Sequence, residues 1–251
     1  MAKQKGIVKL NGTIGDLTFY KSKDGFIARE KSGIDAARIA NDPAFQRTRE
    51  NGAEFGRAGK TSKILRSSVR TFLQKASDGR MVSRLTQEMM KVIKSDSTSE
   101  RGARNVLDGN LGLLTGFDFN VTAKLGATVF AGYTATIDRV TGACTINIPA
   151  FVPAEMIAAP SGSTHYNIFS TAVAVDFLTG DFTNAWEETA PMPWNNVATA
   201  VTTLVNTLPA NSTHPLFLLM GIEFLQEVNG FMYSLKNGSF NAFAVVKVET
   251  V

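Results

Sequence analysis

The segment from Leu216 to Val248, LFLLMGIEFLQEVNGFMYSLKNGSFNAFAVVKV, carries the clearest strand signals of the chain. Aromatic and aliphatic residues fill three runs, which the dipeptides Asn229-Gly230 and Asn237-Gly238 separate. An Asn-Gly pair tolerates positive φ at both positions and therefore joins adjacent antiparallel strands in tight hairpins. The segment predicts a three-stranded antiparallel meander over residues 216–228, 231–235 and 240–248.

Further strands are expected upstream of this meander, where β-branched and aromatic residues mix with Thr, Gly and Asn. The predicted ranges are 117–122, 127–131, 133–139, 143–148, 166–170, 172–177 and 201–208. Many short strands at near-regular spacing are typical of a β-sandwich. We therefore predict that residues 111–251 form an antiparallel β-sandwich.

Residues 34–110 show helical patterns instead. Asp42-Pro43 predicts a helix start, because Asp accepts hydrogen bonds from free N–H groups and Pro suits the first helical position. Apolar residues at three- and four-residue spacing predict helices near 45–59, 64–73 and 82–93, and Ser97–Glu100 has the capping-box spacing for a short fourth. Three glycines in the first helix each cost roughly 1 kcal/mol of helix propensity. Either a neighbouring element approaches closely there, or the helix breaks near Gly56–Gly59.

The first 31 residues predict a small β-meander. Turn signals at Asn11-Gly12 and Lys23-Asp24-Gly25 separate expected strands over 6–10, 13–20 and 26–31. Such short strands do not bury a core alone, so they must pack on their own helices or on another chain. The predicted fold class is α+β, with an N-terminal β-hairpin or meander plus a helical module (1–110) and a C-terminal antiparallel β-sandwich (111–251).

The two predicted domains carry opposite charge. Residues 1–110 hold 22 of the 26 Lys and Arg and 12 of the 22 Asp and Glu, a formal +10, and residues 111–251 hold the other 4 and 10, a formal −6. Such asymmetry indicates modules with different partners. Three interpretations stay open: solvated basic helix faces, nucleic-acid contact by the basic half, or contact with the acidic half of a neighbouring copy.

Few residues suit catalysis or metal binding. The single Cys144 excludes a disulfide framework, and two histidines, His165 and His214, leave little room for triad or metal chemistry. Gly59-Lys60-Thr61 resembles the end of a P-loop, but Glu54 stands where that motif needs Gly. The acidic pairs Glu187-Glu188 and Glu223/Glu227 have no spacing that predicts acid–base catalysis. We therefore predict a non-enzymatic protein without a cofactor.

The sequence shows no membrane or export signal. No run approaches the roughly 18 apolar residues that span a bilayer. The basic start, Met1–Gly6, has no apolar segment behind it, so no signal peptide is predicted. We expect the protein in the cytoplasm or in a virion.

Several motifs resemble those of uncharacterised proteins from Bacteroidetes-type bacteria and their phages. They are Gly6–Tyr20, Lys23-Asp24-Gly25 and the Asn41–Asn51 stretch with its Asp-Pro-x-x-Gln-Arg pattern, together with Glu223–Gly230 and Lys236-Asn237-Gly238. That group shares a Gly-rich N-terminal hairpin, a helix of this pattern and a β-rich C-terminal domain. The resemblance implies a phage- or virion-type structural role and brings no catalytic residue with it.

The favoured hypothesis is a self-assembling structural protein that forms a homo-oligomer or binds other virion proteins. Its N-terminal hairpin adds an open edge to a neighbour's sheet, and a head-to-tail contact of this kind builds rings or filaments. The predicted contact residues are Lys3, Lys5, Lys9, Phe19, Tyr20, Lys21, Lys23, Phe26 and Arg29.

The alternative is a nucleic-acid-associated protein that contacts phosphates through its basic helices. Lys63, Arg66 and Arg70 are its candidate residues, because they cluster at helical spacing. Phe45, Phe55 and Phe72 are expected on the apolar helix faces, so base stacking is not predicted.

Overall fold

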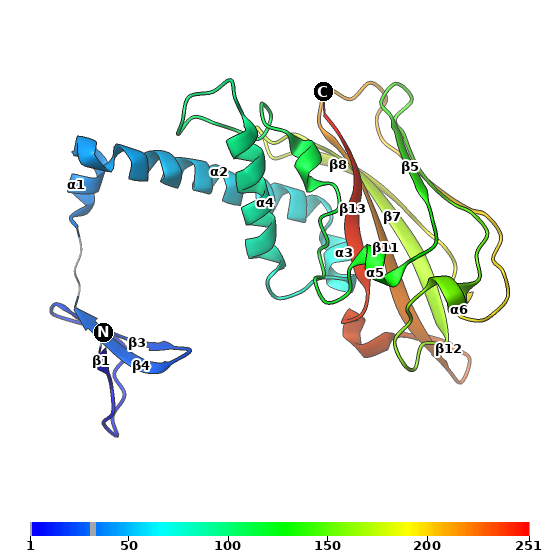
Figure 1. Cartoon of the computed structure of the whole chain (residues 1–251), viewed down its shortest axis with the longest axis horizontal. Coiled ribbons are helices and arrows are strands. Elements are labelled where there is room, and N and C mark those ends of the chain that lie inside the picture. Colours follow the sequence, from blue (N-terminus) through cyan, green and yellow to red (C-terminus); the bar gives the residue numbers. More distant parts are fainter. Residues whose placement is uncertain (1, 31–33, 251) are drawn as a thin grey trace. The chain divides into compact units, whose positions relative to one another are not determined.

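The structure, a computed structural model, describes residues 2–30 and 34–250 (Figure 1). It confirms the α+β class, with helices and several antiparallel sheets. The chain divides into two compact units, Met1–Glu50 and Asn51–Val251. This division differs from the boundary near residue 110 that composition and charge indicated, because helices of the 51–110 segment share a hydrophobic core with the C-terminal sheet.

The first unit contains a four-stranded antiparallel sheet of order β1-β4-β3-β2. Its elements are β1 (Ala2–Lys3), β2 (Gly12–Ile14), β3 (Leu17–Ser22), β4 (Gly25–Glu30), α1 (Ala36–Asn41) and a 3-10 turn, η1 (Pro43–Phe45). The predicted turn between β3 and β4 is confirmed, since Ser22 pairs with Gly25. Lys31, the end of the expected third strand, lies outside the described residues.

The first predicted hairpin turn is wrong. Gly15-Asp16, not Asn11-Gly12, forms the two-residue turn, with Ile14 paired to Leu17 and φ +57° at Gly15. Residues 6–10 form a loop instead of a strand, which the Gln4 side chain closes through hydrogen bonds of 3.3 and 2.9 Å to the Leu10 backbone. The edge position expected for that strand, beside β3, is taken by β2, and β1 forms the opposite edge beside β4.

The rest of the chain contributes the main helices and two further sheets. The helices are α2 (Gln46–Ser68), α3 (Arg70–Lys75), α4 (Met81–Ser95), α5 (Leu125–Thr128) and α6 (Pro153–Met156), with 3-10 turns η2 (Leu111–Leu114) and η3 (Leu235–Gly238). The strands are β5 (Thr134–Asp138), β6 (Ala143–Ile148), β7 (His165–Val175), β8 (Phe182–Glu188), β9 (Met192–Pro193), β10 (Thr202–Thr207), β11 (Leu216–Val228), β12 (Phe231–Ser234) and β13 (Ala242–Glu249).

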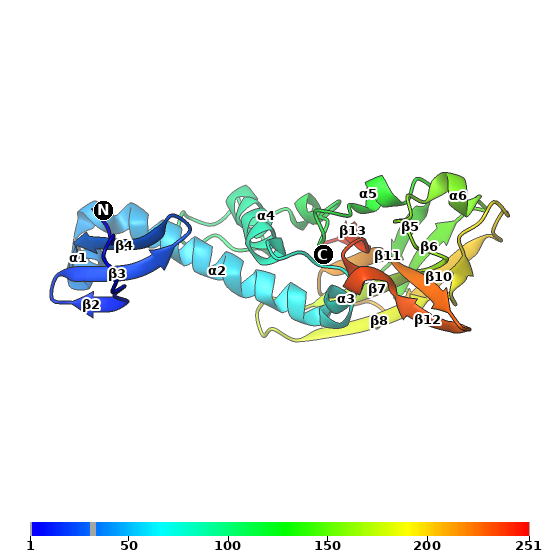
Figure 2. The same ribbon diagram turned by 90° about the horizontal axis from the view of Figure 1, so that it is seen from below.

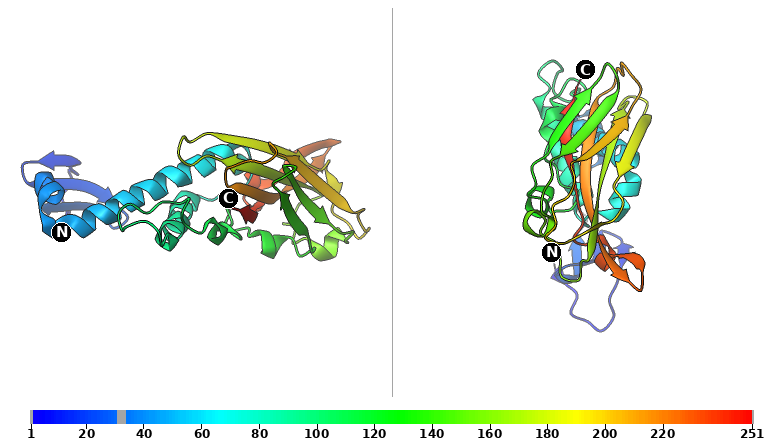
Figure 3. Two further views of the ribbon diagram at one scale, coloured as in Figure 1. Left: turned by 90° about the horizontal axis from the view of Figure 1, so that it is seen from above. Right: turned by 90° about the vertical axis from the view of Figure 1, so that its right-hand side faces the viewer.

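Six strands form one sheet of order β12-β11-β7-β8, with β13 beside β11 and β9 beside β7, and the order β10-β6-β5 forms a second. The predicted limits of β6 and β11 are confirmed. The expected strands 166–170 and 172–177 are one strand, β7. Expected strand 127–131 is wrong: its first two residues belong to the short helix α5, and Val129 forms only an isolated bridge to Ile157. β8 was not predicted. Figure 3 shows the larger sheet curling around the smaller one.

Both faces of the central strands of the larger sheet, β7 and most of β11, are buried. Phe217 and Leu219 of β11 pack in the core that contains α3 and α4, whereas Leu218 and Met220 pack in the core that contains β6 and β10. Alternate residues of a strand point to opposite faces, so the helices cover one face and the smaller sheet covers the other (Figures 1 and 2). Each such side chain contributes roughly 1.5–3 kcal/mol of burial free energy, which explains the nearly continuous apolar run of β11.

The helical segment differs from prediction in two places. Helix α2 continues unbroken through Gly52, Gly56 and Gly59, and a Cβ added at any of them would meet no described atom within 4 Å. Neither the expected break nor the expected close approach occurs. Residues 97–100 form no helix, because Asp96 accepts the nearby N–H groups in a turn. No described helix is long and apolar enough to cross a membrane.

Candidate functional site

One face of the N-terminal sheet is mainly apolar and partly exposed, with Phe19 and Phe26 half-buried. Cross-strand pairing places Ile14 opposite Leu17 and Phe26 opposite Lys21, with Phe19 on the same face. Ile14 is 63% exposed and Leu17 is 46% exposed. Among the described residues up to Glu50, only Ile27, on the opposite face, is buried. The sheet therefore has almost no core of its own.

Cations lie against the aromatic rings of this sheet. The Nζ atoms of Lys9 and Lys21 lie 5.9 and 5.8 Å from the ring centroid of Phe26. On the opposite face the Arg29 guanidinium lies 5.6 Å from the Tyr20 ring centroid. Cation–π contacts at exposed sites contribute about 0.5–1 kcal/mol each. These contacts keep the charged groups beside apolar surface, so the sheet presents positive charge and apolar side chains together.

The other predicted contact residues are placed less closely. Lys3 lies on β1 opposite Ile27. Lys5 lies in the loop before β2, and Lys23 lies in the turn between β3 and β4; all three are exposed. The structure thus brings together Lys9, Lys21 and Phe26 and, separately, Arg29 and Tyr20.

The predicted basic helix cluster is only partly retained. Lys63 and Arg66 lie three residues apart on α2 and share a face. Arg70 begins α3, after an interruption at Val69, where φ is −117° and ψ is 21°. Helical spacing therefore no longer relates Arg70 to the other two. Lys63 and Arg70 are exposed and Arg66 is half-buried.

The expectation that Phe55 lies on an apolar face is wrong. Phe72 is buried, 5.2 Å from the ring of Phe169, but Phe55 is 61% exposed. Phe55 and Met90 line a pocket of about 560 Å³ together with the cations Lys94, Arg101 and Arg104. Sequence reasoning missed this pocket because the two arginines belong to a loop far from Phe55 in the chain. The available signal was the position of Phe55 at the margin of the buried stripe of α2.

Two of the candidate acidic residues converge on one lysine. The Lys75 Nζ atom lies 2.9 Å from Glu188 Oε2 and 3.1 Å from Glu223 Oε2. Burial alone would lower the pKa of the Lys75 ammonium, but the hydrogen bonds and charges of Glu188 and Glu223 outweigh this and raise it. This triad connects α3 to β8 and β11, so both carboxylates are engaged in an ion pair.

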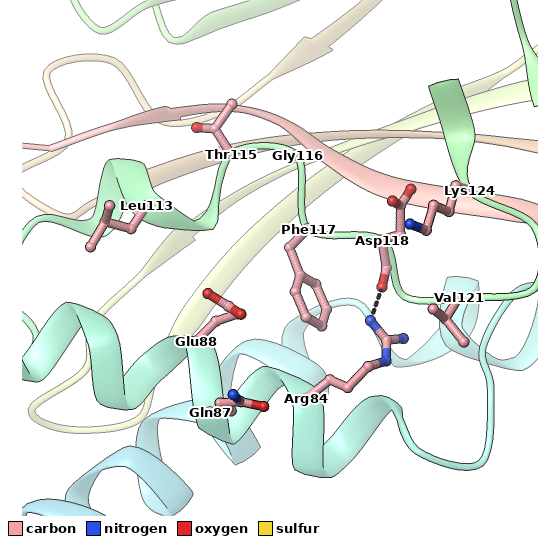
Figure 4. Close-up of a pocket in the computed structure, with 10 residues that line it drawn as sticks. All are labelled: Arg84, Gln87, Glu88, Leu113, Thr115, Gly116, Phe117, Asp118, Val121 and Lys124. Atoms are coloured by element: carbon pink, nitrogen blue, oxygen red, sulfur yellow. Dashed lines mark hydrogen bonds between the residues drawn. The ribbon is translucent and has the colours of Figure 1, made fainter. Parts of the chain in front are cut away.

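A second polar pocket, of about 380 Å³, lies between α4 and the segment that precedes α5 (Figure 4). Arg84 donates to the Asp118 carbonyl at 2.7 Å and pairs with the carboxylate of Asp78. The Asp118 carboxylate accepts from the Leu125 N–H at 2.9 Å, and burial raises the pKa of this carboxyl. Backbone bonds along β13 also order the segment, for example from Phe119 N–H to Phe243 O at 2.8 Å. The bonds of Arg84 thus join α4 to the segment expected as strand 117–122.

The histidines and the cysteine lie apart in the fold. His165 contacts the Thr164 hydroxyl at 3.0 Å, and the backbone carbonyl of His214 accepts from Arg139 at 2.9 Å. Cys144 is buried, and burial raises the pKa of its thiol to about 11. Within the described ranges, no group of three or more His, Cys, Asp or Glu could hold a metal ion.

Comparison of the chain with protein-family models, with curated proteins and with solved structures gives no match. Function must therefore be argued from the two surfaces that the geometry singles out. One is the apolar and basic N-terminal sheet. The other is the aromatic and basic pocket around Phe55.

Proposed function

We propose that this protein is a non-enzymatic, self-assembling structural subunit, in which the N-terminal sheet of one copy binds a neighbouring copy. The observation that carries the proposal is the partly exposed apolar face of that sheet, on which Ile14 is 63% and Leu17 46% exposed, while only Ile27 of the described part of the sheet is buried. Sheets of a few short strands need a packed hydrophobic face to be stable. A partner that covers this face would supply the missing core.

Burial of the apolar side chains on this face by a partner would contribute to the free energy of binding. Full burial of an exposed side chain contributes roughly 1.5–3 kcal/mol, so Ile14 and Leu17 would each contribute part of this amount, and the half-buried Phe19 less. Contiguous exposed apolar surface with a polar rim is typical of interaction sites. Lys9 and Lys21 provide such a rim beside Phe26.

The acceptor in the neighbouring copy is proposed to be β8. Between Arg139 and Lys236 the sequence has seven acidic residues and no Lys or Arg. β8 is an edge strand of the larger sheet. Its Phe182 and Trp186 are 42% and 57% exposed, and the neighbouring Asp181 and Glu187 are also exposed. Opposite charges fix orientation and speed association. A head-to-tail contact of this kind forms rings or open filaments.

A virion or phage particle is the proposed setting, with the cytoplasm as the site of assembly. What supports this is the resemblance of the N-terminal hairpin and the Asp42-Pro43 helix start to phage-type proteins. Other virion proteins are then possible partners beside further copies of the chain.

Analytical ultracentrifugation and negative-stain imaging of the full chain test the proposal. The wild type is expected to form oligomers at near-physiological salt, and both deletion of residues 2–30 and the single change Leu17→Glu should give monomers. Val140→Glu is the matched control, because Val140 is 68% exposed and lies far along the chain from the N-terminal sheet. A monomeric wild type, or oligomers that persist in Leu17→Glu, would overturn the proposal.

A second candidate function is association with nucleic acid through the basic helical module. The specific observation in its favour is that Phe55 is exposed among Lys94, Arg101 and Arg104 rather than buried. Lys63 and Arg66 extend the positive charge along the same helix. A steep fall of DNA affinity between low and moderate salt is the expected behaviour.

A further inference from the structure

We infer that the pocket between α2, α4 and the loop of residues 96–105 binds one nucleotide unit of single-stranded nucleic acid. The base stacks on Phe55, and the flanking phosphates contact Lys94, Arg101 and Arg104. The inference rests on the second candidate function and gives it a site. It is independent of assembly through the N-terminal sheet.

Phe55 provides an open aromatic surface. It lies on α2 with 61% of its surface exposed, beside the half-buried Met90 of α4. Gly52 and Gly59 lie near it on the same helix, and no described atom lies within 4 Å of the Cβ position of either. A planar group can therefore approach both the ring and the helix backbone. Base–aromatic stacking in single-strand binders contributes about 5- to 150-fold in affinity per base.

Three cations and one buried carboxylate, Glu54, line the pocket beside this ring. Lys94 is exposed in the last turn of α4, and Arg101 and Arg104 follow in the next loop. The Nε atom of Arg104 is buried and has no hydrogen-bond partner in the part of the chain that the structure describes. Arg101 donates to Asn51 Oδ1 at 3.1 Å, which positions its guanidinium beside α2. Guanidinium groups suit phosphate oxygens because their planar donors can bind in pairs.

The loop that carries both arginines is fixed before any ligand binds. The buried Glu54 carboxylate accepts from the Gly102 N–H at 2.8 Å, and Arg57 donates to the Arg104 carbonyl at 2.7 Å. Asp96 accepts from the Thr98 and Ser99 N–H groups at 2.9 and 3.0 Å. A loop ordered in advance loses little entropy when it binds. These contacts therefore hold the loop against α2 and the end of α4.

The combination favours a single-stranded nucleotide over other anions. An acidic peptide would use the cations but gain little from the ring of Phe55. A duplex would offer phosphates but keeps its bases stacked inside. The pocket volume of about 560 Å³ lies in the range of small-molecule sites, roughly 300–1,000 Å³. The shared chemistry is a phosphate next to an accessible base, from either a single strand or a free nucleotide.

Fluorescence anisotropy with a labelled 15-residue oligothymidylate tests the inference on the full chain. Phe55→Ala should weaken binding roughly 5- to 150-fold relative to the wild type. Phe55→Trp keeps an aromatic ring and should bind with an affinity near that of the wild type. The control Phe231→Ala removes another exposed phenyl ring, 68% exposed on β12, and should leave affinity unchanged. Competition with thymidine monophosphate separates the two sources. If a single strand is the ligand, the mononucleotide should displace the labelled oligothymidylate only weakly. If thymidine monophosphate displaces it completely at equal concentration, the free nucleotide is the ligand of the same site.

Charge is tested by the salt dependence of the same assay. The double variant Lys94→Gln/Arg101→Gln should lower the slope of log affinity against log salt by about 1.4, since each single-strand phosphate contact contributes about 0.7. The matched control, Arg80→Gln/Lys91→Gln, also removes two exposed cations. Arg80 immediately precedes α4 and Lys91 lies on it, and neither lines the pocket. Its slope should stay near that of the wild type.

Three outcomes would overturn the site. If the oligonucleotide does not bind at low salt, the site and the second candidate function both fail. If it binds but Phe55→Ala and Phe231→Ala behave alike, while Lys63→Gln/Arg66→Gln weakens binding, nucleic-acid association stands and the pocket is wrong. If polyglutamate competes as well as the oligonucleotide, the pocket recognises acidic peptide instead.

Discussion

The carboxylate of Glu54, only 2% exposed on α2, accepts a hydrogen bond from the backbone N–H of Gly102, 2.8 Å away. This contact joins a helix to a loop that follows it by almost fifty residues. It also explains why a Glu stands within the stretch that resembles a P-loop: its carboxylate accepts a backbone N–H of the loop. The helical state of Gly59-Lys60-Thr61 in α2 agrees with this role.

Removal of the Glu54 carboxylate should loosen that loop. We expect Glu54→Ala to lower the free energy of unfolding by about 1–3 kcal/mol, because the Gly102 N–H loses its acceptor in a poorly hydrated site. Glu54→Gln keeps an acceptor oxygen and should cost less. Urea denaturation of the three proteins checks the order, and equal stability of the Ala and Gln variants would contradict it.

The same loop should show a pH signature through Asp96. The hydrogen bonds from the Ser99, Asn105 and Thr98 N–H groups hold the pKa of this carboxyl well below its usual range. A depressed pKa in the folded state gives stability that is present above the unfolded pKa, about 3.9, and is lost as pH falls through the folded pKa. Asp96→Asn should therefore have a lower urea midpoint than the wild type from pH 5 to 8. The difference should shrink below about pH 4; a constant difference down to pH 2 would refute the assignment.

The Lys75 triad should contribute to stability in the opposite pH direction. Lys75→Met leaves Glu188 and Glu223 without their cation, and we expect a loss of about 1–3 kcal/mol, between the values for exposed and buried pairs. The pKa of Lys75 is raised, so this contribution is fully present below the unfolded pKa, about 10.4, and is lost as pH rises through the folded pKa. The loss should be constant from pH 7 to 9 and decrease above about pH 10.5.

A matched control for this triad is the exposed pair of Lys91 and Glu88, whose lysine side chain is 56% exposed. Lys91→Met should change the free energy of unfolding by less than about 0.5 kcal/mol. Thermal or urea denaturation measures both variants. A loss at Lys75 no larger than that at Lys91 would show that the triad is not stabilising.

Two glycine substitutions should have opposite effects. A Cβ at Gly221 of β11 would lie 2.3 Å from Phe169 Cζ and 2.7 Å from the Ala242 carbonyl oxygen. Gly221→Ala should therefore cost at least about 1–3 kcal/mol through overpacking. Gly56→Ala places a methyl group in open space on α2 and should raise stability by about 0.5–1 kcal/mol. Loss of stability at Gly56 would show that another chain or element occupies the helix face.

The α+β class and the strands with a strong local signal were predictable from the amino-acid sequence. Its run of aromatic and aliphatic residues gave the limits of β11, and Asn229-Gly230 gave the turn to β12, with positive φ at both residues. The Lys23-Asp24 turn was predicted for the same reason. Such turns and strands depend on the conformational preferences of residues that are neighbours in the chain, and these preferences follow directly from the residue types.

Tertiary structure alone decided which elements cover one another. It chose Gly15-Asp16 over Asn11-Gly12 as the hairpin turn, because residues 12–14, not 6–10, pair with β3. It left Phe55 exposed beside Arg101 and Arg104, although spacing along α2 alone placed that ring with the apolar residues. Strand pairing and surface clusters bring together residues that are distant in the chain. Whether a side chain is buried depends on which element packs against it, and the local sequence pattern does not specify that element.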